Sequence, residues 1–241
     1  MVAGFVPTVR IDGGFKFGGI LDNFGPTCQS VIRTTEMTNT TSQSRGRSAY
    51  DSIAPHYDKA VRPLDRWFLA RLRANTLNYL PPGARVLELG AGTGLNFVFY
   101  PTNATGVASE PNNYMLRLAS AKERPDKIQL VQSCAEQLPF KNNSFDAAFA
   151  TLVFCSVAQP EAAFSELRRV VKPGGTVLLL EHVRPGGLFG SVFDFLNLFT
   201  VPLFNDHFNR RTAAEAQAAG LQLVKVEKSL LGIINLIACR V

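Results

Sequence analysis

Short apolar segments alternate with helix-like segments from residue 85 to the end of the chain. A strand covered on both faces is apolar throughout, whereas a helix that packs on a sheet has apolar residues three and four positions apart. Residues 160–171 follow the helical pattern, residues 172–175 should end that helix, and a polar helix is expected around residues 211–219. The expected strands are residues 85–87, 104–109, 128–131, 145–151, 176–180, 221–227 and 230–239. This alternation predicts one doubly wound α/β domain.

The first 47 residues lack this alternation. Small polar residues dominate residues 34–48, the earlier apolar residues are aperiodic, and no signal-peptide order of basic, apolar and small residues is present. We therefore expect a flexible N-terminal extension, residues 1–47, followed by the folded domain, residues 48–241. Met37 directly precedes the run Thr38-Asn39-Thr40-Thr41-Ser42 of this tract and is an alternative start of the native protein.

Composition and charge narrow the class of protein. A chain of 241 residues with 46% hydrophobic residues can fill one α/β core. The net charge of +6 is spread along the chain, and aromatic residues are not interleaved among the basic ones, so we expect no nucleic-acid partner. Weak contact with anionic lipid at a membrane surface stays open. The cysteines lack metal-ligand spacing, which predicts no metal site and reduced thiols in a cytoplasmic protein.

A glycine-rich turn that follows the first expected strand is the main candidate for a binding site. Its glycines stand at alternate positions, where they allow a tight turn and close approach of a ligand to bare backbone. Leu95 occupies the third glycine position of a dinucleotide fingerprint, and the turn lacks the lysine of a P-loop. Glu88 would repel a pyrophosphate but could pair with a cationic amino group. The turn is Glu88-Leu89-Gly90-Ala91-Gly92-Thr93-Gly94.

This turn resembles motif I of the class I S-adenosylmethionine-dependent methyltransferases, whose cofactor carries a sulfonium and a free α-amino group. A turn that only brings a helix close to a sheet would explain Gly90 or Gly92 but not the placed Glu88. The resemblance implies S-adenosylmethionine as the cofactor. It also implies a Rossmann-like, doubly wound sheet of seven mostly parallel strands, with helices on both faces and the last strand antiparallel.

Further residues fit the same cofactor. Glu110 follows the second expected strand and stands 22 residues after Glu88, the spacing at which an acidic residue bonds ribose hydroxyls. Residues 134–140 resemble the D-A-E-x-L-P-F segment that contacts adenine in this superfamily, although Cys134 replaces the aspartate, so Glu136 or backbone groups must read the adenine amino group. Thr151 ends the fourth expected strand, beside the methyl donor. The expected cofactor-binding set is Glu88, Gly90, Ala91, Gly92, Gly94, Asn96, Glu110, Pro111, Ala135, Glu136 and Thr151.

Residues 50–58 resemble a Y-D-x-x-A-x-x-Y-D segment that forms a lid over the donor in many small-molecule methyltransferases. Tyr50 and Tyr57 are therefore expected at the substrate, and an amphipathic helix packed on the sheet is an equal alternative. Four further segments look like the methyltransferase-like 7 group, which is associated with thiol S-methylation. They are residues 94–101, 151–157, 181–183 and 206–209. From the sequence as given, we expect no counterpart of the apolar N-terminal membrane anchor of the animal proteins.

Methyl transfer is an in-line displacement that mainly requires alignment of acceptor and donor. A thiol acceptor reacts as the thiolate, so His182 and Asp206 are candidate catalytic residues, although His182 could only orient a partner and Asp206 could cap a helix. Residues 188–204 carry five phenylalanines and should roof an apolar acceptor pocket, or form core or dimer surface. We expect methyl transfer to a small hydrophobic acceptor, with a thiol favoured over a lipid or quinone precursor. A non-catalytic module that binds the donor is the alternative.

Overall fold

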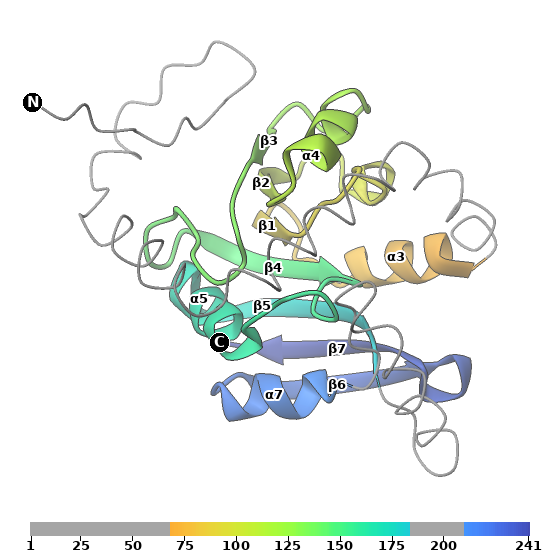
Figure 1. The fold of residues 1–241 in the computed structure, drawn as a ribbon, viewed down its shortest axis with the longest axis vertical. Helices are drawn as coiled ribbons and strands as arrows, with labels where there is room; N and C mark the ends of the chain where they lie inside the picture. The colour runs from red at the N-terminus through yellow and green to blue at the C-terminus, as the bar shows by residue number, and fades with distance from the viewer. Residues whose placement is uncertain (1–67, 184–209) are drawn as a thin grey trace, which may run out of the picture.

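The computed structural model describes residues 68–183 and 210–241, which form one seven-stranded sheet with helices (Figure 1). The strand order is β3-β2-β1-β4-β5-β7-β6, and every neighbouring pair is parallel except those that involve β7. The strands are β1 (Arg85–Leu89), β2 (Thr105–Ser109), β3 (Ile128–Val131), β4 (Phe145–Thr151), β5 (Val171–His182), β6 (Gln222–Ser229) and β7 (Ile234–Arg240). The helices are α3 (Ala70–Leu77), α4 (Asn113–Ser120), α5 (Pro160–Val170) and α7 (Thr212–Ala218), with the 3-10 turns η2 (Phe97–Phe99) and η3 (Leu230–Gly232). The predicted fold class, including the antiparallel last strand, is confirmed.

The two larger of three hydrophobic clusters among the described residues lie on opposite faces of the sheet, because successive side chains of a strand point to opposite faces. Leu87 of β1 packs in the core that α5 and α7 cover, whereas its neighbour Val86 packs in the core that includes Leu77 of α3 and Ala119 of α4. Helices α5 and α7 contact each other over the half of the sheet formed by β5, β7 and β6 (Figure 1). The central strands are buried on both faces, which explains their continuous apolar sequences.

Two element boundaries differ from the sequence-based expectation. Residues 172–175 do not form a separate loop but a bulged part of β5, since the pairing with β4 shifts between Phe145 and Ala147. Val241, the residue after β7, supplies the backbone partners there, because its carbonyl oxygen accepts from the Gly174 amide at 2.8 Å and its amide donates to the Gly175 carbonyl oxygen at 3.1 Å. Residue Leu230 does not begin the last strand. It lies in η3 with a φ of +50°, inside the connection that reverses the chain between β6 and β7.

The chain crosses the sheet at β1. From β1 it runs outward through β2 to β3, and it then returns to β4 on the other side of β1. In open α/β sheets, ligands bind beyond the carboxyl ends of the strands at such a switch point. The residues that follow β1 and β2 and the last residue of β4 meet at this edge, which we call the carboxyl edge.

Candidate active site

The glycine-rich turn leaves β1 at the carboxyl edge. Gly90, Gly92 and Gly94 have φ values of +68°, +55° and +81°, in the left-handed region that glycine adopts without strain. A Cβ atom on Gly90 would lie 2.6 Å from Cγ2 of Val153, so the segment after β4 packs directly on the turn. A Cβ atom on Gly92 would meet nothing within 4 Å. The turn therefore presents open backbone at Gly92, as a cradle for a ligand requires.

Glu110 fastens this turn to the end of β2. Its carboxylate accepts hydrogen bonds from the Gly92 amide at 2.9 Å and the Asn112 amide at 2.8 Å, and the residue is 7% exposed. Burial raises the pKa of the Glu110 carboxyl, and the two backbone hydrogen bonds oppose this rise. The structure thus places Glu110 beside the turn, at the edge where a ribose contact was expected. The contact itself stays a prediction.

Glu88, at the end of β1, is 0% exposed. Its carboxylate accepts hydrogen bonds from Nδ2 of Asn96 at 2.6 Å and from the hydroxyl of Tyr100 at 2.7 Å. Burial raises the pKa of the Glu88 carboxyl, although both hydrogen bonds and the positive charge of Arg73 lower it. The predicted pairing of Glu88 with a cationic amino group stays a prediction, and internal donors already bind both of its oxygens.

Arg73 of α3 completes a buried polar network that the sequence reasoning missed. The residue is 5% exposed, and its Nη1 donates to Oδ1 of Asn96 at 3.0 Å and to Oγ1 of Thr151 at 2.7 Å. Nδ2 of Asn96 also donates to Oγ1 of Thr151, at 2.8 Å. Arg73 is one of the basic residues whose charge is spread along the sequence. Its position four residues before the buried Leu77 places both side chains on one helical face and was the available signal.

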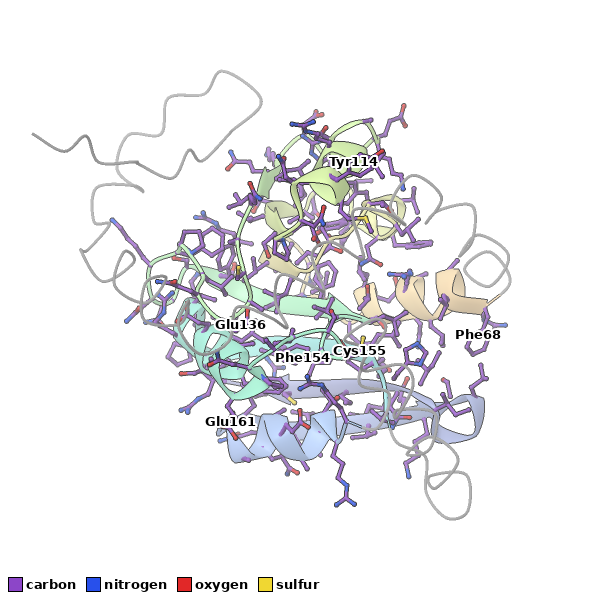
Figure 2. The ribbon with its side chains drawn as sticks, viewed as in Figure 1. Phe68, Tyr114, Glu136, Phe154, Cys155 and Glu161 are labelled. Atoms are coloured by element: carbon purple, nitrogen blue, oxygen red, sulfur yellow. The ribbon has the colours of Figure 1, made fainter. Side chains whose placement is uncertain are left out.

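Residues 134–140, the segment expected to contact adenine, lie against the start of α5. Ala135 is buried, and the Glu136 carboxylate accepts hydrogen bonds from the amides of Ala158 at 3.1 Å and Gln159 at 3.3 Å (Figure 2). A carboxylate just before a helix is stabilised by the unpaired amides and the helix dipole. The carbonyl oxygen of Pro111 accepts a hydrogen bond from the side chain of Gln132. Glu136 therefore has a structural partner, and its contact with adenine stays a prediction.

The segment after β4 is fixed by a buried carboxylate at the end of β5. Glu181 accepts hydrogen bonds from the amides of Val153 at 3.0 Å and Phe154 at 3.1 Å, and the Phe154 ring stacks on that of Phe164 in α5 (Figure 2). The sequence predicts for Glu181 only a place in residues 181–183, a segment that looks like the methyltransferase-like 7 group. Its neighbour His182 lies half-buried at the same edge, and the proposed role of His182 in catalysis stays a prediction.

Several predicted residues lie outside the described residues. They are Tyr50, Tyr57, Asp206, residues 188–204 and the proposed domain boundary at residues 47 and 48. In residues 68–183 and 210–241, no three His, Cys, Asp or Glu side chains form a group that could hold a metal ion. The helices of the same part of the chain do not reach the length and hydrophobicity needed to cross a membrane.

The sequence of this site matches a known family. Residues 87–179 fit the family model of the methyltransferase domain. They form a methyltransferase domain, and solved structures with this fold include methyltransferases that depend on S-adenosylmethionine. The matched stretch runs from β1 to β5 and contains the glycine-rich turn, Glu110 and Thr151. The predicted family is therefore confirmed.

Relatives of known function differ in their acceptors. The chain is 32% identical over 147 residues to a demethylmenaquinone methyltransferase from Renibacterium salmoninarum, an alignment that covers 60% of the chain and 62% of that protein. It is 35% identical over 150 residues to the thiol S-methyltransferase TMT1B of Mus musculus, which covers 59% of the chain and 62% of that protein. The chain thus spans about three fifths of the length of these relatives.

Solved structures share the fold. A methyltransferase from Thermotoga maritima that depends on S-adenosylmethionine superposes with a TM-score of 0.57 at 24% identity, over 76% of the chain and 97% of that protein. The [4+2]-cyclase SpnF superposes with a TM-score of 0.56 at 18% identity, over 71% of the chain and 80% of that protein. Since a cyclase has the same fold, the fold alone does not fix the reaction.

Proposed function

We propose that this chain transfers a methyl group from S-adenosylmethionine to a small acceptor. The observation that carries the proposal is the open backbone at Gly92, fastened by the buried Glu110 at the switch point of a methyltransferase domain. A nucleoside with free ribose hydroxyls fits this arrangement, because a carboxylate accepts hydrogen bonds from both. The carboxylates of Glu88 and Glu110, at the ends of β1 and β2, suit a cationic ligand.

In this proposal, each part of the donor would lie at the end of a different strand. Glu110 would accept from the ribose hydroxyls, and the segment after β3, with Pro111 and Ala135, would hold the adenine. The methionine part would lie over Gly90 and Gly92, toward the end of β4. When bound, the donor supplies an electrophilic methyl group, and the protein mainly aligns the acceptor with it.

For the acceptor we propose a hydrophobic thiol first, in line with the thiol S-methyltransferase relatives. The nucleophile would be the thiolate, with His182 or Asp206 as the group that takes its proton. A quinone precursor is the second candidate, because demethylmenaquinone and ubiquinone methyltransferases are similarly close relatives. A lipid acceptor and a module that only binds the donor are the remaining alternatives.

The test uses the full chain, methyl-labelled S-adenosylmethionine and three acceptors: an aryl thiol, a demethylated naphthoquinol and phosphatidylethanolamine vesicles. Calorimetry should show donor binding, and label should pass to the thiol with the highest kcat/KM. Glu110→Gln should weaken donor binding at least about tenfold, since it removes the charge that accepts the ribose hydrogen bonds. Asp146→Asn is the matched control, because Asp146 lies at the start of β4, away from the carboxyl edge. This variant should bind the donor like the unaltered protein. Absence of donor binding would contradict the proposal, and binding without transfer to any acceptor would favour the module.

A further inference from the structure

The buried network at the carboxyl edge has a fixed hydrogen-bond direction. The guanidinium of Arg73 can only donate, so the Asn96 atom that it contacts at 3.0 Å must be the amide oxygen. The amide nitrogen of Asn96 then faces Glu88 and Thr151, at 2.6 Å and 2.8 Å. This orientation also gives the Glu88 carboxylate the donor that it needs. The two charged ends therefore determine which way the central amide points.

The same direction determines what the Thr151 hydroxyl can do. Its oxygen accepts from Nη1 of Arg73 at 2.7 Å and from Nδ2 of Asn96 at 2.8 Å. A hydroxyl has two lone pairs and one proton, so both acceptor sites are used and only the proton is left for a further bond. Because Thr151 is 6% exposed, burial of that proton without an acceptor would be costly. The residue is thus set as a hydrogen-bond donor at the end of β4.

The sheet order indicates which part of the ligand meets this donor. The strands run β3-β2-β1-β4, and under the proposed function adenine and ribose occupy the ends of β3 and β2. The methionine part then extends across the turn after β1 to β4. Its ammonium has no lone pair, and its positively charged sulfonium sulfur does not accept hydrogen bonds. Its α-carboxylate, in contrast, is a strong hydrogen-bond acceptor. The positive guanidinium of Arg73, which donates to the Thr151 hydroxyl, also favours an anionic group next to that hydroxyl.

We propose that the Thr151 hydroxyl donates a hydrogen bond to the α-carboxylate of the methyl donor, and that Arg73 is the positioning residue that fixes this hydroxyl through Asn96. The inference rests on the proposed function and adds an atom-level assignment to it. It gives β4 a role in selecting donors that carry the carboxylate. It also explains why a charged residue from α3 is buried at this edge.

The test compares two ligands, S-adenosylmethionine and its decarboxylated form, by calorimetry on the full chain. The unaltered protein should prefer the carboxylated ligand. Thr151→Val should reduce this preference about tenfold or more, since a hydrogen bond to a charged group is lost, whereas Thr151→Ser should keep it within about threefold. Arg73→Met should also reduce the preference. Arg71→Met, an exposed position on the same helix, is its matched control and should leave the preference unchanged.

The preference ratio separates positioning from general loss of stability, because a loosened fold weakens both ligands alike. If Thr151→Val does not fold, as judged by circular dichroism, Thr151→Cys replaces it, since a thiol is only a weak donor. Equal weakening of both ligands, a change confined to the KM of the acceptor, or no preference in the unaltered protein would overturn the inference. In those cases donor binding by the unaltered protein leaves the proposed function standing. Binding of neither ligand by the unaltered protein would overturn both.

Discussion

The two edges of the sheet use the same residue types in opposite ways. At the amino edge, where the parallel strands begin, Asp146 of β4 is partly exposed. Its carboxylate accepts hydrogen bonds from Nζ of Lys172 and from the Arg85 amide, and these partners lower the pKa of its carboxyl. At the carboxyl edge, Glu88 and Glu110 are buried, and burial raises the pKa of both carboxyls. An exposed, paired carboxylate stabilises a fold modestly, whereas buried carboxylates cost free energy to keep charged. This difference supports the proposed ligand site at the carboxyl edge.

The largest expected effect comes from glycines at the two ends of β1. Gly83 and Gly90 have nearly equal φ values, +70° and +68°, so alanine brings similar backbone strain at either position. A Cβ atom on Gly83 meets nothing within 4 Å, but one on Gly90 lies 2.6 Å from Val153. We expect Gly83→Ala to lower the free energy of unfolding by about 1–2 kcal/mol. Gly90→Ala should cost about 2–5 kcal/mol, because overpacking is added to the strain.

Urea unfolding measures both values, and donor calorimetry provides a second readout. Gly90→Ala should also abolish donor binding, because Val153 must move away from the turn. Gly83→Ala should keep the donor affinity of the unaltered protein. Similar stability losses for both variants would mean that the segment after β4 does not constrain the turn.

The sequence predicted the sheet and the turn because their signals are local. Apolar runs give the strands, and the alternating glycines give left-handed turn positions that no neighbouring segment needs to specify. The partners of the turn were harder to find, since they depend on contacts between distant positions. Thr151 bonds Arg73, 78 residues away, and the Glu136 carboxylate bonds amides 22 and 23 residues further on. The position of a residue in a motif indicates its edge of the sheet but not the atoms that its side chain meets.

A smaller effect is expected from neutralising one carboxylate at each edge. Glu88→Gln should lower the free energy of unfolding by about 1–3 kcal/mol, because the amide nitrogen of glutamine cannot accept one of the two buried hydrogen bonds that Asn96 and Tyr100 donate. It should also weaken donor binding about tenfold or more, since the charge that suits a cationic ligand is removed. Asp146→Asn should cost less than about 1 kcal/mol, because its pair with Lys172 is exposed.

Thermal melting and donor calorimetry on both variants test this contrast. Unchanged donor affinity in Glu88→Gln would show that the carboxylate acts only within the fold. Weakened donor binding in Asp146→Asn would mean that the amino edge also influences the site, and the contrast between the edges would then be wrong.

The smallest effect is a difference in the pH dependence of stability without ligand. A carboxyl whose pKa is raised on folding, such as that of Glu110, binds more protons in the folded than in the unfolded state. Its contribution to the free energy of unfolding is therefore present below the ordinary pKa of 4.5 and is lost as the pH rises through the folded pKa. Glu110→Gln should therefore flatten the decline of stability above pH 4.5. Asp146 behaves in the opposite way, because its lowered pKa gives stability above 3.8 that is lost as the pH falls through the folded pKa. Asp146→Asn should flatten only this acid limb in urea titrations, and a change in the same limb for both variants would show that the two edges do not differ in their electrostatics.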